Sequence, residues 1–81
     1  MSEWTQIEGS HTSRKASFKK IVERILDGED VVGTYEHNKF WVRFEGGGEK
    51  AAKSIQKIIE SFKEFDKNAK LELIANIPYY A

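Results

Sequence analysis

The chain has no cysteine, one proline and two histidines among its 81 residues. Without thiols there is no disulfide framework, no iron–sulfur cluster, no thiolate zinc site and no cysteine nucleophile. No apolar run is long enough to cross a bilayer. The first four residues are polar and acidic in character, unlike a secretory signal peptide. We therefore expect a cytoplasmic protein that carries no metal and no cofactor.

Charge of either sign is not in excess, because thirteen basic residues balance thirteen acidic ones. The sequence thus lacks the surplus positive charge that normally drives binding to a phosphate backbone. The charge is nevertheless uneven: residues 10–24 hold five cations and one anion, and residues 27–36 hold four anions and no cation. The length suits one small domain, and we assign residues 1–81 to it.

Two segments have the apolar spacing of amphipathic helices. In the first, steps of three and four join Ala51, Ile55, Ile58, Ile59, Phe62 and Phe65. This pattern predicts a helix over 51–65, with Gly46-Gly47-Gly48 just before it, Glu49 in its first turn and Asn68 as its C-terminal cap.

The second helical segment runs from about Arg14 to Asp27. Its apolar face consists of Phe18, Ile21, Val22, Ile25 and Leu26. A hydroxyl satisfies an orphan backbone N–H at a helix start, so Ser13 or Ser17 is the predicted cap. Gly28 is well placed to end the helix, since glycine tolerates the left-handed conformation.

Strand patterns fill the remaining segments. Residues 40–44 alternate, and residues 31–36 precede them across His37-Asn38, which predicts a hairpin that pairs Glu36 with Lys39, Tyr35 with Phe40 and Val31 with Phe44. This register also sets opposite charges across from each other beside the turn. A last strand alternates through Leu71, Leu73, Ala75 and Ile77, and Pro78 argues against a central position for it. A first strand is predicted from Trp4 to about Gly9, although apolar and polar residues alternate poorly there.

The element order is therefore strand, helix, strand, strand, helix, strand. Two such half-units, each crossing over through a helix, form the split βαβ or ferredoxin-like arrangement. We expect an α+β two-layer sandwich in which a four-stranded antiparallel sheet carries both helices on one face.

This topology leaves the second face of the sheet without a covering layer. Alternation predicts that the following side chains lie on it: Trp4, Val32, Thr34, Trp41, Arg43 and Ile74, together with Gln6, Glu72 and Asn76. Exposed aromatic residues beside an arginine are typical of interfaces. The leading hypothesis is a small non-enzymatic binding or regulatory module, whose open face serves self-association as a homodimer or binds a protein partner.

A second hypothesis is binding of single-stranded RNA or DNA on the same face. The segment Trp41-Val42-Arg43-Phe44 resembles the aromatic–Val–x–aromatic end of the third-strand motif of RNA recognition domains. It departs from that motif at Phe40, where a small residue is usual, and it lacks the preceding Lys-Gly pair. The resemblance implies stacking of bases on the sheet aromatics.

One end of the predicted sheet is basic, because three connections meet there: residues 10–15, the His37-Asn38 turn and residues 67–70. Cations and a helix N-terminus both favour anions, so Arg14, Lys15 and Lys39 are candidates for an anion site, with solvated loop charge as the alternative. His11 and His37 lack a convergent carboxylate, so we expect two surface histidines and no metal site. The third hypothesis is a small phosphate-handling enzyme that uses one of these histidines. No catalytic constellation is recognisable, and we assign no catalytic residue.

Overall fold

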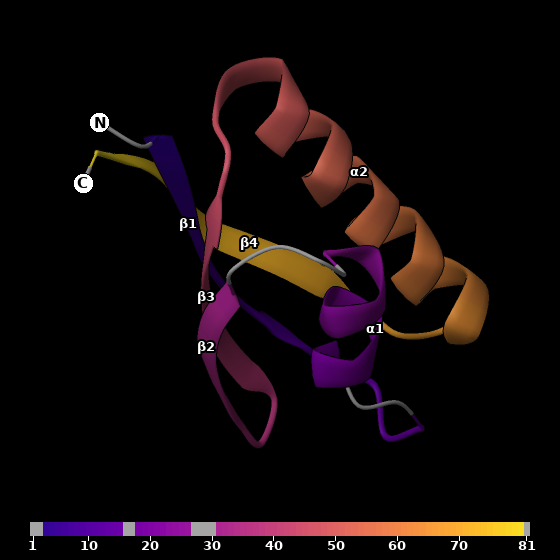
Figure 1. Cartoon of the computed structure of the whole chain (residues 1–81). Helices are drawn as coiled ribbons and strands as arrows, with labels where there is room; N and C mark the ends of the chain where they lie inside the picture. The colour runs from indigo at the N-terminus through magenta and orange to yellow at the C-terminus, as the bar shows by residue number, and fades with distance from the viewer. Residues whose placement is uncertain (1–2, 16–17, 27–30, 81) are drawn as a thin grey trace.

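The structure is a computed structural model, and it describes residues 3–15, 18–26 and 31–80. The elements follow the predicted order: β1 (Glu3–His11), α1 (Phe18–Ile25), β2 (Val31–Glu36), β3 (Lys39–Glu45), α2 (Gly48–Phe65) and β4 (Leu71–Tyr80). The strands form one antiparallel sheet in the order β2-β3-β1-β4. Both helices lie on one side of this sheet (Figure 1). The predicted ferredoxin-like α+β sandwich is therefore confirmed.

The core lies between the sheet and the two helices. Each strand contributes the inward half of its alternation, and each helix contributes its apolar stripe. The buried apolar residues are Ile7, Phe18, Ile21, Val22, Leu26, Phe40, Val42, Phe44, Ala51, Ile55, Ile58 and Phe62. All of them lie at the interface between the sheet and the helices, so the opposite face of the sheet contributes no side chain to this core.

The β2–β3 hairpin has the predicted register. Val31 pairs with Phe44, Tyr35 with Phe40 and Glu36 with Lys39. The two-residue turn requires a positive φ at its first position, and His37 adopts it with φ 57°. A histidine in this left-handed region is strained relative to glycine. The pairing of all six β2 residues with β3 closes the hairpin around this turn.

The helix limits differ from the prediction. α2 begins at Gly48, three residues before Ala51. Its C-cap is Asp66, whose backbone N–H donates to the carbonyl of Phe62 at 3.0 Å, so the assignment of this role to Asn68 is wrong. Asn68 instead donates its backbone N–H to Oδ1 of Asp66 at 3.2 Å.

The first helix begins at Phe18 rather than near Arg14. Ser13 does not cap it. The Ser13 hydroxyl accepts the backbone N–H of Lys15 at 3.2 Å and donates to Asp66 at 2.9 Å, so the hydroxyl already has two partners before the helix begins. The other predicted cap residues, Ser17 and Gly28, lie outside the described residues.

The β1–β4 pairing contains a bulge between Glu8 and Gly9. Gly9 pairs with Leu73, but Glu8 pairs with Ala75, so Ile74 is the additional residue of β4. The pairing of β4 with β1 is therefore not continuous over 71–77, because one residue of β4, Ile74, has no partner on β1. The side chains of residues 75–77 lie outside the described residues, and with them the predicted facing of Ala75, Asn76 and Ile77.

The bulge explains why residue 9 is a glycine. A Cβ atom there would collide with the carbonyl oxygen of Glu72 and would lie 2.8 Å from Cζ of Phe40. One contact comes from the backbone of β4 and the other from a core side chain of β3. Because Gly9 has no Cβ, both the β4 backbone at Glu72 and the buried Phe40 ring can pack directly against it.

Pro78 lies on an edge strand, as the prediction required, because β4 has only β1 as a neighbour. The backbone N–H of Thr12 points toward β4 and donates to the Lys70 carbonyl, whereas the N–H of His11 points toward the hairpin and donates to the Asn38 carbonyl. Because the direction of the backbone groups alternates along a strand, the even-numbered residues of β1 make the hydrogen bonds to β4. Pro78 is opposite Thr5, an odd-numbered residue that makes no hydrogen bond to β4. The backbone nitrogen of Pro78 therefore faces the free edge of the sheet, and the absence of an N–H there removes no hydrogen bond between strands.

Candidate functional site

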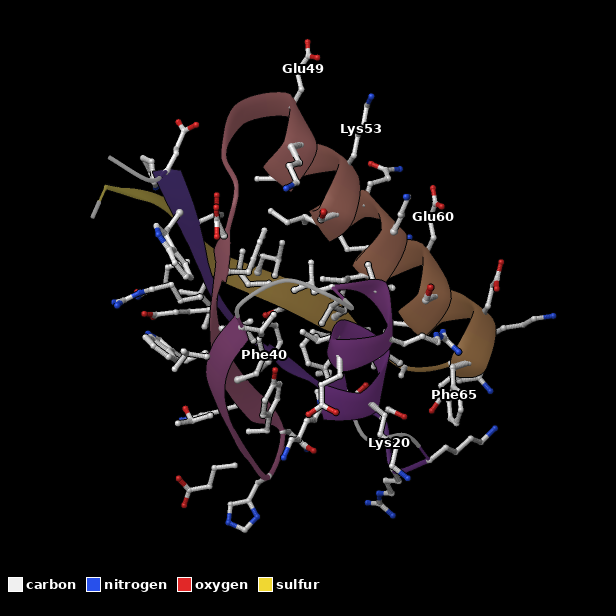
Figure 2. All side chains as sticks on the ribbon, viewed as in Figure 1. Lys20, Phe40, Glu49, Lys53, Glu60 and Phe65 are labelled. Atoms are coloured by element: carbon white, nitrogen blue, oxygen red, sulfur yellow. The ribbon has the colours of Figure 1, made fainter. Side chains whose placement is uncertain are left out.

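The open sheet face is the first candidate surface. On β1 the residues Thr5, Ile7, Gly9 and His11 are buried beneath the helices, so the intervening residues point outward. The same alternation on β2 and β3 gives the outward set Val32, Thr34, Trp41 and Arg43. The open-face patch comprises Trp4, Val32, Thr34, Trp41, Arg43 and Ile74. In Figure 2 both helices lie on the other side of the sheet, and no helix of the described residues covers the side chains on this side.

Apolar surface is accessible within the open-face patch. Val32 is 58% exposed and Ile74 is 75% exposed, which are high values for branched aliphatic residues. Thr34 is exposed, whereas Trp4, Trp41 and Arg43 are half-buried. Burial of aliphatic side chains this exposed is favourable. A partner that covers them and removes them from water would therefore be stabilised by the hydrophobic effect.

A polar network runs through the middle of the face. Nε and Nη2 of Arg43 both donate to Oε1 of Gln6, at 3.3 and 2.9 Å, and Nε2 of Gln6 donates to Glu8 at 2.9 Å. The Arg43 guanidinium also lies 5.2 Å from the ring centroid of Trp41, a cation–π distance. The guanidinium is therefore fixed in place, and it holds the indole beside it in a defined position.

The register separates the two tryptophans. Trp41 is opposite Glu8, while Trp4 is opposite Glu45, so the two indoles lie four β1 residues apart. At the rise of an antiparallel strand this is about 13 Å. The Gln6–Arg43 pair occupies the position between them. The structure therefore brings Trp41, Arg43, Thr34 and Val32 together on β2–β3 and leaves Trp4 at the far end of the face.

The charge of the open face is acidic. By strand alternation and pairing, its described side chains include four carboxylates and two cations: Glu8, Glu36, Glu45 and Glu72 against Lys39 and Arg43. A phosphate backbone laid on this face would meet an excess of like charge. The electrostatics thus weigh against nucleic acid on the open face and favour a cationic partner surface.

The basic end of the sheet is the second candidate. The predicted meeting of three connections there is confirmed. His11 donates its backbone N–H to the Asn38 carbonyl at 2.8 Å. Thr12 donates its backbone N–H to the Lys70 carbonyl at 3.0 Å, and its hydroxyl accepts the backbone N–H of Lys70 at 2.8 Å. The β2–β3 turn and the start of α1 lie at this end in Figure 1. Arg14 and Lys15 are exposed in the β1–α1 connection.

His11 is not the surface histidine that we predicted. It is 7% exposed, and its ring stacks on Phe18 at 5.7 Å and lies 5.5 Å from Phe62 between centroids. Burial lowers its pKa below the ordinary 6.5. The alternation of β1 extends two residues beyond Gly9 and would have placed His11 inward. His37, by contrast, is exposed as predicted.

Ser13, His11 and Asp66 lie together, but not as a nucleophile with its base. Ser13 Oγ donates directly to Oδ2 of Asp66 at 2.9 Å, and Nδ1 of His11 accepts the backbone N–H of Ser13 at 3.2 Å. A catalytic triad requires the histidine to accept from the nucleophile's hydroxyl. This geometry is that of a structural clamp, because the buried carboxylate joins the β1–α1 connection to the C-terminus of α2.

A small cavity opens at the basic end. Its volume is about 180 Å³, and we refer to it as the end cavity. Its lining comprises His11, Ser13, Phe18, Lys19, Tyr35, His37, Asn38, Lys39 and Phe40. Of the predicted anion-site residues, Lys39 is part of this lining, whereas Arg14 and Lys15 are not. Lys19 and Tyr35 were not among the residues predicted at this end, because they come from α1 and from the inward face of β2.

Residues 3–15, 18–26 and 31–80 bring together no group of three His, Asp or Glu side chains able to hold a metal ion. Within the same ranges, neither helix has the length and apolar character needed to span a membrane.

Comparison with known proteins identifies the fold and no family. No protein-family model matches the chain, and no curated protein matches it. The de novo designed protein Foldit4 is similar in structure, with a TM-score of 0.55, 15% sequence identity and 98% of each chain covered. A second de novo design, described as having a ferredoxin fold, gives a TM-score of 0.52 and 17% identity over 96% of this chain and 86% of its own. At such identities the likeness concerns the fold alone, and the chain has a ferredoxin-like fold.

Proposed function

We propose that this protein is a non-enzymatic binding module and that its open sheet face binds a protein surface rich in basic side chains. The observation that carries the proposal is the uncovered face itself, on which Trp41 and Arg43 form a fixed pair beside Val32, an aliphatic side chain that is 58% exposed. Aromatic residues and arginine are the usual anchors of protein interfaces. A cytoplasmic location stays a prediction from the sequence.

Charge supports a basic partner over a second copy of this chain. The carboxylates Glu8, Glu36, Glu45 and Glu72 outnumber the cations of the face. Two such faces brought together would juxtapose like charges, which costs free energy. A partner with lysines or arginines around an apolar centre would neutralise the acidic residues and cover Val32 and Trp41.

The same charges argue against the nucleic-acid alternative. The described cations of the face are Arg43, which is bound to Gln6, and Lys39 beside the turn. Stacking of bases on Trp41 would therefore occur without the phosphate neutralisation that supplies most of the affinity.

The test is a selection of peptides followed by matched variants. A phage-displayed peptide library is selected on the immobilised protein, and the affinity of the enriched peptides is then measured for Trp41→Ala, Val32→Ser and Phe65→Ala. Phe65 is the control, because it is 53% exposed on α2, and Figure 2 shows it on the helix layer. We expect basic peptides with an apolar residue, about tenfold weaker for the two face variants and unchanged for the control.

Three results would overturn the proposal. The first is a set of peptides whose affinity is insensitive to both face variants. The second is a dimer in light scattering that Trp41→Ala dissociates, which would assign the face to self-association. The third is quenching of tryptophan fluorescence by poly(U) at low salt that Trp41→Ala abolishes, which would assign it to single-stranded nucleic acid.

A further inference from the structure

We propose that the end cavity is a binding site for a small oxyanion, with phosphate as the representative ligand. The cavity is formed by the end of β1, the start of α1 and the β2–β3 turn, and polar and cationic residues make up most of its lining. None of the six residues of the open-face patch lines it. The proposal is therefore independent of the function proposed above, and each can fail without the other.

His11 supplies a buried donor at this site. Its Nδ1 accepts the backbone N–H of Ser13 at 3.2 Å, so the neutral ring carries its proton on Nε2. His11 is 7% exposed and lines the cavity, and within the described part of the chain Nε2 has no hydrogen-bond partner. A buried donor without an acceptor is costly, and an anion oxygen in the cavity would provide the acceptor.

Two lysines stand at the rim. Lys19 and Lys39 belong to the lining and are exposed, so their flexible stems are free to turn toward a bound anion. No carboxylate is among the described residues that line the cavity. Glu23 pairs with Lys19 at 3.9 Å, and Glu36 is the cross-strand partner of Lys39, but both lie outside the lining.

The start of α1 adds to the positive potential at the cavity. Tyr35 belongs to the lining, but its hydroxyl lies beside Gly33, further from the β2–β3 turn, and is not counted among the donors. Phe18 and Lys19, the first two residues of α1, line the cavity, which places the positive end of that helix dipole beside it. His11, the two lysines and the start of α1 thus line one small volume.

The volume restricts the class of ligand. At about 180 Å³ the cavity is smaller than the roughly 300 Å³ at which pockets for drug-sized ligands begin. It has room for one phosphate, sulfate or small carboxylate group, but not for a whole nucleotide. A phosphoryl group attached to a larger molecule would fit only with the rest of that molecule outside the cavity.

The test is an NMR titration with inorganic phosphate at constant ionic strength, in which sodium chloride replaces phosphate as the reference salt. We expect saturating shifts of the His11 imidazole and of the Lys39 amide. Lys39→Gln should weaken phosphate binding at least threefold, and His11→Phe, which keeps an aromatic ring between Phe18 and Phe62, at least tenfold. A parallel titration with glycerol 3-phosphate distinguishes free phosphate from a phosphate ester, and binding of either one supports the site.

Lys53→Gln is the matched control. It removes the same charge from an exposed residue of α2, which Figure 2 shows pointing away from the sheet. Phosphate affinity should be unchanged in this variant. Shifts that do not saturate, an equal loss of affinity in Lys53→Gln and Lys39→Gln, or full affinity in a folded His11→Phe protein would each overturn the proposal.

Discussion

The hydroxyl of Ser13 donates a hydrogen bond of 2.9 Å to the carboxylate of Asp66, across 53 positions of sequence. Both side chains are buried, at 5% and 7% exposure. The same carboxylate accepts the backbone N–H of Asn68, and the same hydroxyl accepts that of Lys15. This buried hydrogen bond therefore links the β1–α1 connection to the C-terminus of α2.

Removal of this hydroxyl should destabilise the fold. Ser13→Ala leaves Oδ2 of Asp66 buried with one donor fewer, so we expect the free energy of unfolding to fall by about 1–3 kcal/mol. Urea denaturation measures the change. Gln56→Ala is the control, because its 3.1 Å bond to Glu60 is on the exposed side of α2 and should cost little. Equal losses for the two variants would contradict the structural role of the Ser13–Asp66 contact.

The burial of His11 makes stability depend on pH. Its folded pKa lies below 6.5, so the unfolded chain binds the proton more readily, and stability is lost as the pH falls from about 6.5 through the folded pKa. Urea midpoints between pH 7.5 and 5 should fall more steeply for the wild type than for His11→Phe. His37→Gln serves as the control, since His37 is exposed, and its profile should follow the wild type. Parallel profiles for the wild type and His11→Phe would show that this prediction is wrong.

Gly9→Ala should destabilise the bulge region. The added Cβ meets the Glu72 carbonyl and the Phe40 ring, and backbone cannot move aside as a side-chain end can. We expect a loss of about 3 kcal/mol, near the upper end for overpacking. Gly48→Ala is the comparison, because a Cβ at Gly48 meets no atom within 4 Å and only its φ of 53° is unfavourable. Its expected cost is about 1–2 kcal/mol. Thermal unfolding that ranks these two variants in the opposite order would refute the steric account.

Pro78 should protect the free edge of β4. Pro78→Val restores an N–H that points away from β1, where a second strand can accept it. We expect light scattering to show more self-association in this variant at equal concentration. Pro78→Ala supplies the same N–H without the larger side chain, so it should associate as well. Association in the valine variant alone would mean that the side chain, and not the donor, is responsible.

The hairpin was predictable because two local signals agreed on its register, namely the alternation of 40–44 and the Glu36–Lys39 pair beside the turn. The start of α1 was not, because the hydroxyl of Ser13 is engaged by Asp66, far away in sequence. The bulge at Ile74 could not be predicted, because no residue pattern within β4 marks it. It depends on the pairing of β4 with Glu8 and Gly9, which only the assembled sheet provides.

The candidate sites divide in the same way. Alternation was sufficient to place Val32, Thr34, Trp41 and Arg43 on one face, because they come from two strands joined by a short turn. The end cavity draws His11, Lys19 and Lys39 from three elements. No spacing in the sequence relates them, so their proximity required the three-dimensional structure.

The sheet order has a consequence for the course of folding. The central strand β1 is the first in sequence, and its neighbour β4 is the last, so that Glu3 pairs with Tyr80. Closing so long a loop is entropically unfavourable and slows the formation of non-local sheets. During synthesis β1 would pair first with β3 and wait for its second neighbour. A ribosome-bound intermediate with 71–80 still in the exit tunnel would therefore expose the unpaired side of β1, a strand edge open to chaperones and to premature association.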